Sequence, residues 1–590
     1  MRRLLVLSGF LVVIAASTLA ARAAVSLPPH PDPNFAGTLV PSPCSATAGN
    51  PYEHAIFAQE GWAGPDYVRY PGACQRLHFA FGPISVKPGQ NDVLIEPISI
   101  DKPAYDGYIT RMAANLVLPD GTVPPIEQMH LHHGTWLSLT GDYGLGPWFA
   151  AGEEKTDGDI PRGYGMPVKA SDQWQLLYMV HSAVPQTTAV YITYDIDYIA
   201  KDRAESYPVN LKPAYPIWLD VRSGSFYPVF NAQRGFGSGG TCTWPAQQCA
   251  SLDPWGHVSP GQGAKPGETG QDLTLPARGQ RLGRIASFQG GTLIGIGGHL
   301  HPGGLYDAVD LVRGGQSRRI FTSQAKYWGR TDHASLGGPP NSWDFSMTVT
   351  GLPRWGVHVR PGDTLRINAA YDTVLQDTYE DMGIAVAYLA PDGPNGAPTA
   401  PGLDPFAAPL DASAGCTSGG LAKGFLCDKG VVTHGHLPEA SNYGGPTGAG
   451  LAARKGPALN QIQIAGFNYV GSDLSTVSMT GVPVVKLGQT LTFVNDDAAA
   501  DVYHTITTCA FPCLGPTGVA FPIADGRTSL GRPLQLDSAE LGYGPPFGPA
   551  RNAVQWSVNV NAAGGYRPGE IVTFYCRIHP FMRGAFQVGA

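Results

Sequence analysis

The stretch Tyr575-Cys576-Arg577-Ile578-His579-Pro580-Phe581-Met582-Arg583-Gly584 lies at the C-terminal end of the chain. The residues before it, from Glu570 to Tyr575, alternate polar and apolar side chains, which predicts a strand that presents Cys576 at its end. Pro580 predicts a tight turn that brings His579 and Met582 back toward the cysteine. A thiolate, an imidazole and a thioether from one loop, completed by a distant histidine, make up the ligand set of blue copper.

His504 is the candidate for that distant histidine, because it closely follows the strand-like run Thr490–Val494. The alternative is a buried free cysteine with an unrelated core methionine and a surface histidine. The region 456–590 resembles the cupredoxins, and its short His-Pro-Phe-Met-Arg-Gly loop closely resembles that of the amicyanins. The resemblance implies a Greek-key β-sandwich with one type 1 copper held by His504, Cys576, His579 and Met582.

The N-terminus predicts export. Two arginines precede an apolar run from Leu4 to Ala16 and an Ala-x-Ala sequence at Ala21–Ala23, which is typical of a cleaved signal peptide over residues 1–23. No later run of about twenty apolar residues follows, so we expect no membrane span after signal removal. The expected location is secreted or periplasmic.

Composition favours an all-β protein. Charged residues make up 14% of the chain, whereas it contains 76 glycines and 53 prolines, a balance typical of loop-rich β domains. The formal net charge is −7 and no basic stripe is present, which argues against nucleic acid as a partner.

The chain has nine cysteines. If Cys576 binds copper, the other eight can form disulfides, as expected of an exported protein. They fall into local pairs, although neighbourhood alone does not fix the connectivity: Cys44 with Cys74, Cys242 with Cys249, Cys416 with Cys427, and Cys509 with Cys513. One cysteine could also simply be left over.

The larger N-terminal part carries a second set of candidate ligands. It contains an adjacent pair, His132 and His133, a later His181 in a strand-like run, and His299 and His301 separated by one residue. On an extended chain, residues two apart project to one face, so His299 and His301 would point the same way. Met382 opens a further strand-like run.

In this order the residues resemble the copper type II, ascorbate-dependent monooxygenases, which include the peptidylglycine and dopamine enzymes. The segments Gly107–Ile109 and Val190–Asp197 are also similar to the stress up-regulated Nod19 family. The first resemblance implies two type 2 coppers, one on His132, His133 and His181, and a catalytic one on His299, His301 and Met382. It also implies O2 and a small organic substrate whose C–H bond is hydroxylated, with ascorbate or a redox protein as electron donor.

Other interpretations of these histidines stay open. Each one alone can be a hydrogen-bonded structural residue, and zinc is the chemical rival because imidazoles do not choose the metal. His130 shares a strand face with His132, whereas His132 and His133 point to opposite faces unless the strand ends or bulges between them.

The chain departs from the peptidylglycine enzymes at the substrate. These enzymes hold a substrate carboxylate with an arginine before the His-x-His and with polar residues after the methionine. Here the matching positions are Gly297 and Gly298, and Gly383 with the apolar residues that follow it. A peptide substrate is therefore in doubt, and no acidic cluster favours a catecholamine.

Residues 393–455 are predicted to form a linker with a disulfide-bonded loop, because the stretch begins rich in proline, glycine and alanine. His434 and His436 lie in it without a visible third ligand, so we interpret them as loop residues rather than a metal site. A multicopper oxidase is excluded because Cys576 is flanked by Tyr575 and Arg577, not by histidines.

These observations predict an all-β protein. Two tandem monooxygenase-like β-sandwiches, at 28–225 and 226–392, would precede the cupredoxin sandwich, which would relay electrons to the type 2 coppers. The non-enzymatic alternative is an extracellular copper-binding or electron-transfer protein, since a fold does not establish an activity.

Overall fold

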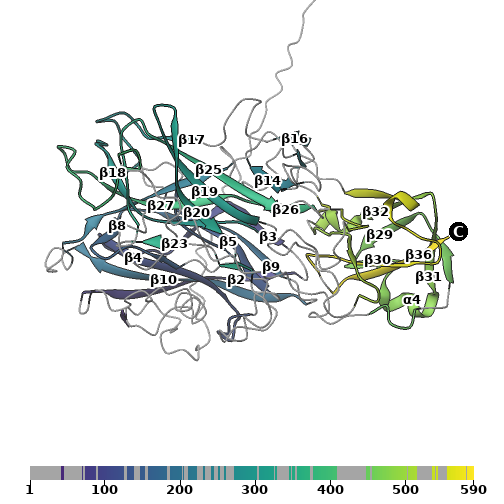
Figure 1. Cartoon of the computed structure of the whole chain (residues 1–590). Coiled ribbons are helices and arrows are strands. Elements are labelled where there is room, and N and C mark those ends of the chain that lie inside the picture. The colour runs from purple at the N-terminus through teal and green to yellow at the C-terminus, as the bar shows by residue number, and fades with distance from the viewer. Residues whose placement is uncertain are drawn as a thin grey trace, which may run out of the picture.

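In the computed structural model, the regular secondary structure of the described residues consists almost entirely of β-strands, which confirms the predicted all-β fold class (Figure 1). It also contains the short helix α4 (Leu474–Thr480) and the 3-10 turns η2 (Asp496–Ala500) and η3 (Ala562–Gly564). The structure describes residues 42–44, 70, 73–87, 91–124, 129–138, 146–152, 157–182, 186–201, 204, 210–221, 230–232, 241–244, 250–252, 258–260, 272–301, 304–324, 326–327, 345–346, 349–351, 355–372, 377–407, 447–451, 455–500, 502–513, 534–538, 540–542, 554–579 and 581–590. The predicted signal peptide, Cys249, Cys416, Cys427, His434, His436 and Pro580 lie outside these residues.

The first sandwich consists of two sheets. One has the spatial order β1 (Ser42–Pro43), β2 (Gln75–Val86), β10 (Thr188–Ala200), β4 (Gly107–Val117), β8 (Tyr164–Val168) and β11 (Lys212–Pro213), with β7 (Asp157–Asp159) paired to β4. The other has the order β3 (Asn91–Ile100), β9 (Trp174–Ser182), β5 (Met129–Ser138) and β6 (Gly146–Gly152). The Cys44–Cys74 disulfide, which was predicted, forms beside the β1–β2 pair.

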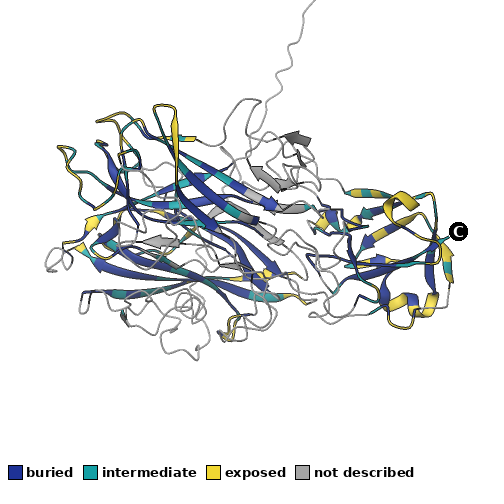
Figure 2. Cartoon of the chain, in the orientation of Figure 1, coloured by how far each residue is buried: buried dark blue, intermediate teal, exposed yellow. Residues whose placement is uncertain are grey.

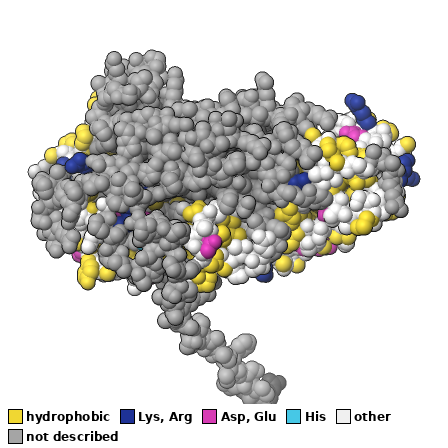
Figure 3. Space-filling view, turned by 90° about the horizontal axis from the view of Figure 1, so that it is seen from below, with side chains coloured by type: hydrophobic (Ala, Val, Ile, Leu, Met, Phe, Trp, Pro, Cys, Tyr) yellow, Lys and Arg dark blue, Asp and Glu magenta, His cyan; other side chains and the backbone are white. Residues whose placement is uncertain are grey.

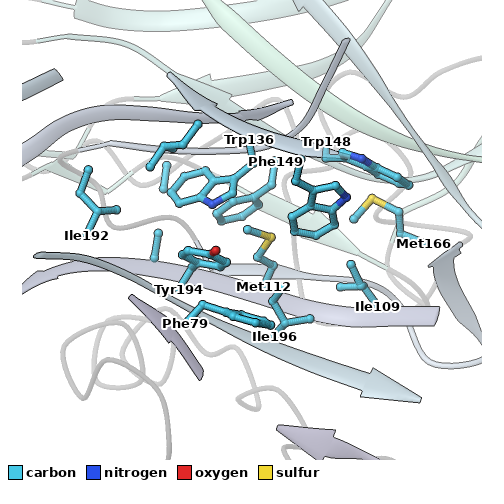
Figure 4. Packing of buried hydrophobic residues seen from close by; sticks show 14 of the residues in the cluster. Phe79, Ile109, Met112, Trp136, Trp148, Phe149, Met166, Ile192, Tyr194 and Ile196 are labelled. Carbon is cyan, nitrogen blue, oxygen red and sulfur yellow. The ribbon is translucent and has the colours of Figure 1, made fainter. Parts of the chain in front are cut away.

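Aromatic side chains fill the space between these two sheets (Figure 4). Trp136 and Phe149 project from the smaller sheet, with ring centroids 5.3 Å apart, toward Tyr194 and Phe79 of the larger sheet. Such rings contribute a large apolar area each, so they account for much of the stability of this core. Strand β5 is buried along nearly its whole length, because Trp136 faces this core while His132 and His133 contact the second sandwich.

The second sandwich also has two sheets. One has the order β12 (Tyr215–Asp220), β27 (Ile384–Pro391), β18 (Gly291–His299) and β23 (Val349–Gly351), with β24 (Val357–Val359) paired to β18. The other has the order β14 (Thr241–Trp244), β25 (Thr364–Asp372), β19 (Gly304–Arg313) and β20 (Gln316–Gln324), with β17 (Asp272–Thr274) paired to β25. Strand β12 precedes residue 226 but belongs to this sandwich. Three two-stranded ribbons accompany it: β13 (Phe230–Ala232) with β26 (Thr378–Asp381), β15 (Ala250–Leu252) with β16 (Val258–Pro260), and β21 (Lys326–Tyr327) with β22 (Phe345–Ser346).

The first and second sandwiches pack directly against each other. Ile294 and Ala390 of the second sandwich belong to the hydrophobic core of the first. Arg284 makes a buried ion pair with Asp172, 2.8 Å between Nη2 and Oδ1, and its guanidinium lies over the Trp148 ring. These contacts hold the two sandwiches in one arrangement, so side chains from both can meet at their interface.

The C-terminal sandwich lies at one end of the molecule (Figure 1). One sheet has the order β28 (Lys455–Ala458), β31 (Val482–Lys486), β36 (Arg583–Gly589), β35 (Ile571–Tyr575) and β33 (Thr507–Cys509). The other has the order β30 (Asn468–Val470), β29 (Gln461–Ala465), β32 (Gln489–Asn495) and β34 (Gln555–Val560). The predicted Cys509–Cys513 disulfide is present, and Cys576 is a buried free thiol.

Burial and surface composition agree with the sequence. Buried residues line the facing strands of all three sandwiches (Figure 2). On the face seen in Figure 3 the described side chains are mostly hydrophobic or uncharged, in keeping with the low content of charged residues. Among the described residues, no helix is long and apolar enough to cross a membrane.

Candidate metal centres

The loop between β35 and β36 brings Cys576, His579 and Met582 together. Strand β35 ends at Tyr575, so Cys576 is the first residue of the loop, as the alternation predicted. The Met582 N–H donates to the His579 carbonyl at 2.8 Å, and the Cys576 N–H donates to the Met582 carbonyl at 3.1 Å. These two bonds fold the loop back on itself, and all three side chains are buried.

His504 approaches the same loop from a different part of the sandwich. Its Nδ1 lies 3.0 Å from Nδ1 of His579, and each of these nitrogens lies 3.8 Å from the sulfur of Cys576. Donors bound to one metal, at about 2.0 Å for nitrogen and about 2.3 Å for sulfur, are separated by roughly 3–4 Å. The three atoms therefore fit a single ion, and Met582 of the same loop offers a soft thioether as a further donor.

The environment of Cys576 favours the thiolate. Burial raises the pKa of the thiol, but interaction with His504 and backbone N–H groups lowers it more, so the net pKa lies below its ordinary value. The N–H of Thr505 donates to Sγ at 3.2 Å and that of His579 at 3.4 Å. A thiolate is the form in which cysteine binds metal.

Asp497 orients His504, which the sequence reasoning did not find. Its carboxylate Oδ2 lies 3.0 Å from Nε2 of His504, which leaves Nδ1 directed at Cys576. Burial raises the pKa of Asp497, but the hydrogen bond with His504 and those from the N–H groups of Phe467 and Gly466 outweigh it, and the net pKa is lowered. The ring of Phe467 then covers both imidazoles, 5.6 Å from His504 and 5.3 Å from His579. The seven-residue spacing of Asp497 and His504 carries no motif that would have indicated this pair.

A β-bulge positions the histidine pair of the first sandwich. In the β5–β9 pairing, Leu131 lies opposite Val180 and His133 opposite Met179, so His132 is the extra residue. The bulge cancels the alternation that would otherwise send neighbouring side chains to opposite faces. His132 and His133 consequently lie side by side, with ring centroids 5.3 Å apart.

His301 of the second sandwich joins this pair. Its ring centroid is 4.3 Å from that of His132 and 6.0 Å from that of His133. One ligand atom from each of the three histidines lies within 4.8 Å of the others, and all three residues are buried. His299 contacts His301, with centroids 4.9 Å apart.

Tyr371 links His301 to Met382 through main-chain atoms. The Tyr371 hydroxyl accepts from the N–H of His301 and from the N–H of Met382, both at 2.9 Å, and donates to the Met382 carbonyl at 2.7 Å. The Met382 side chain is buried and packs with Ile384. The structure thus brings the main chains of these two candidate ligands close together.

His181 faces the C-terminal sandwich. Its Nε2 lies 3.1 Å from the carbonyl oxygen of Ile578, two residues from Cys576, and its ring centroid lies 6.3 Å from that of His579. On its other side His181 stacks on His130, 5.0 Å between centroids and 7° between planes. His130 in turn lies 5.8 Å from His132. His181 and His130 therefore form a row of imidazoles between the Cys576 loop and His132.

Arg577, which follows Cys576, ties the C-terminal sandwich to the second sandwich. Its guanidinium makes a buried ion pair with Asp537, 2.6 Å between Nη2 and Oδ1, and donates from Nη1 to the Asp377 carbonyl at 2.9 Å. The Asp377 N–H in turn donates to Asp537 at 2.7 Å. These buried polar contacts thus fix the C-terminal sandwich to the second sandwich.

Two of the positions that match the substrate clamp of peptidylglycine enzymes, Gly298 and Gly383, have no room for a side chain. A Cβ on Gly298 would lie 2.3 Å from the Asp307 carboxylate and 2.4 Å from Cβ of Ser323, and one on Gly383 would lie 2.5 Å from Cβ of Ala369. Packing therefore requires glycine at these two positions, and neither can carry a side chain of the clamp.

Comparison with known proteins gives weak likenesses. No protein-family model matches the chain, and neither does any curated protein sequence. A solved structure of an amicyanin mutant in its reduced state is 21% identical over 22% of this chain and 79% of that one, with a TM-score of 0.12. A copper-containing nitrite reductase from Thermus scotoductus SA-01 is 14% identical over 50% of this chain and 55% of that one, with a TM-score of 0.13. PNGase F, a glycosylasparaginase from Flavobacterium meningosepticum, is 10% identical over 53% of this chain and 95% of that one, with a TM-score of 0.26. At these scores the function has to be argued from the geometry of the sites.

Proposed function

We propose that the protein is an exported copper redox protein whose C-terminal sandwich holds one blue, type 1 copper. The ligands would be His504, Cys576, His579 and Met582. One observation carries the proposal: a buried sulfur and two buried imidazole nitrogens lie at the separations that one ion requires. Copper bound by this set supplies reversible one-electron transfer.

The surrounding residues suit that task because they hold the donors in place. The N–H groups of Thr505 and His579 fix the sulfur, and Asp497 fixes the ring of His504. Water is kept out, since His504, Cys576 and His579 are fully buried. Ligands that cannot move between the two oxidation states keep the structural cost of each electron transfer small.

The electron acceptor would lie in the same chain. His579 is covered, and the carbonyl of Ile578 contacts His181 of the first sandwich. Joining donor and acceptor in one polypeptide replaces a bimolecular encounter by a contact that is always present. We therefore infer that electrons pass from the C-terminal sandwich to the histidine-rich interface of the other two.

An O2-dependent monooxygenase is the narrower candidate. The observation that favours it is the Tyr371 hydroxyl, which joins the main chains of His301 and Met382 beside His299. The substrate would be a small organic molecule, with ascorbate or a redox protein as external donor, but the carboxylate clamp is replaced by glycines. Oxygen uptake by the reduced protein, coupled to a hydroxylated product, would support this candidate. Uptake without product would favour a non-enzymatic electron-transfer protein.

The blue copper site is tested by loading the mature protein with Cu(II), removing excess metal and recording a quantified EPR spectrum. We expect a signal with narrow hyperfine splitting that integrates to about one copper per chain, together with an intense visible absorption from the thiolate. A protein that binds copper with wide hyperfine splitting throughout would contradict the proposed site.

His181→Phe should slow electron transfer out of the blue site while leaving its copper content and spectrum intact. The substitution keeps an aromatic ring but removes the nitrogen that contacts the Ile578 carbonyl. The measurement is the return of blue absorption when protein reduced by ascorbate without oxygen is mixed with aerated buffer. His358→Gln is the control, because His358 pairs with Asp392 on another part of the second sandwich. Equal rates in the three proteins would rule out this route.

A further inference from the structure

We infer that His132, His133 and His301 form a single metal site across the interface of the first and second sandwiches. It would take one copper ion and leave one coordination position for a small oxygen-donor ligand. The inference deepens the proposed function and rests on it, since this ion would be the electron acceptor. The grouping differs from the ligand sets that the monooxygenase resemblance implies, which place His301 and the histidine pair on different coppers.

The geometry of the three histidines fits one ion. Their ligand atoms all lie within 4.8 Å of one another. Nitrogen donors at about 2.0 Å from a common metal are separated by roughly 3–4 Å, so small side-chain rotations suffice to bring them into place. Their exposed fractions are 3%, 8% and 0% for His132, His133 and His301, so the ion would be shielded from bulk solvent.

The environment of His301 itself points to a ligand. Both of its ring nitrogens are buried, and neither has a hydrogen-bond partner among the residues that the structure describes. Burying polar atoms without partners is unfavourable, unless a ligand that is not part of the protein binds them. A metal ion on one nitrogen removes that cost, and the Tyr371 hydroxyl already holds the main chain of His301 in place.

Two of the other candidate ligands, His181 and Met382, are engaged elsewhere. His181 directs Nε2 at the Ile578 carbonyl and stacks on His130. The side chain of Met382 packs in an apolar group with Ile384, Trp218 and Val386. We therefore assign His181 to the contact with the C-terminal sandwich and Met382 to packing, and neither to this ion.

Three protein ligands leave a place for a fourth. Metal sites that bind substrate keep three protein donors and an open position, whereas structural sites are closed by four. Three imidazoles suit copper in both oxidation states. The electron would move from Cu(I) in the C-terminal sandwich to Cu(II) at this site, so that one ion is oxidised and the other reduced without proton transfer.

The test counts coppers on the full chain. EPR of the Cu(II)-loaded protein should show about two coppers per chain, one with narrow and one with wide hyperfine splitting. Azide, a small anion that binds open copper positions, should shift the wide signal alone. His301→Ala and His133→Gln should each remove the wide signal, with copper affinity at this site lowered by at least about 100-fold. Met382→Leu and the control His358→Gln should retain both signals.

The outcomes separate this inference from the proposed function. A narrow signal alone overturns the three-histidine site and leaves the blue copper intact. The absence of a narrow signal overturns the proposed function. About three coppers per chain, or loss of the wide signal in Met382→Leu, means that the ligand sets of the monooxygenase resemblance are right and this grouping is wrong. Far-ultraviolet circular dichroism of His301→Ala and His133→Gln distinguishes lost ligands from lost folding.

Discussion

Replacing Cys576 with serine should abolish the blue absorption and the narrow hyperfine signal. Both depend on a thiolate bound to copper, and a hydroxyl of nearly the same size does not supply one. The surroundings of Cys576 favour a sulfur ligand, because two N–H groups are directed at Sγ and His504 helps to lower the pKa of the thiol. We expect copper affinity at this site to fall by more than about 100-fold. This is a larger loss than the one expected when a residue that only hydrogen-bonds to a metal ligand is replaced.

The measurement is a competition titration with a copper chelator, followed in the visible region and by EPR. Met479→Leu is the matched control, since Met479 is an exposed sulfur-containing residue of the same sandwich, 68% accessible to solvent. It should bind copper as the unchanged protein does. If Cys576→Ser retained the blue absorption, Cys576 would be a buried structural thiol and the ligand assignment would fail.

Replacing Arg577 with methionine should destabilise the C-terminal sandwich by about 3–5 kcal/mol, the usual cost of leaving a buried charge without its partner. The carboxylate of Asp537 would lose the guanidinium at 2.6 Å, and both side chains are almost inaccessible to solvent. The substitution also removes the hydrogen bonds to Thr507 and to the Asp377 carbonyl. The measurement is urea unfolding of the copper-loaded protein, monitored by the loss of the blue absorption. This absorption reports on the C-terminal sandwich, which contains Arg577.

Two further variants separate charge from volume in this experiment. The double substitution Arg577→Met with Asp537→Leu should recover most of the loss, because an apolar pair of similar size carries no desolvation penalty. Arg319→Met breaks the ion pair with Asp310 at a site where the arginine is 41% exposed, and should cost less than about 1 kcal/mol. An Arg577→Met protein that unfolds at the same urea concentration as the unchanged one would show that this ion pair does not stabilise the sandwich.

Local sequence patterns predicted the parts of this molecule that local forces determine. The alternation before Cys576 predicted strand β35 and the position of the thiol at its end. Cysteine spacing predicted the Cys44–Cys74 and Cys509–Cys513 disulfides. The condition placed on the histidine pair, that its strand must end or bulge, is met by the register shift at His132.

Contacts between distant segments could not be predicted in the same way. Which histidine meets His132 depends on how two sandwiches pack, and the residue that does so, His301, is more than 160 positions away in the sequence. From the sequence we could identify Arg577 only as a neighbour of Cys576. Its partner Asp537 lies in a different segment, and no motif joins the two residues. Asp497 was missed although it lies only seven residues before His504, because no motif joins these two residues.

The bulge at His132 makes the length of strand β5 as important as its composition. Insertions and deletions of one residue are usually tolerated in surface loops. In this strand they would move side chains from one face of the sheet to the other. Removing a single residue such as Leu131 or Thr135 would restore strict alternation between His130 and Trp136, and one histidine of the pair would then turn from the interface to the core. A natural variant that has lost this single residue should therefore keep every amino-acid type that metal binding needs and still be unable to assemble the centre.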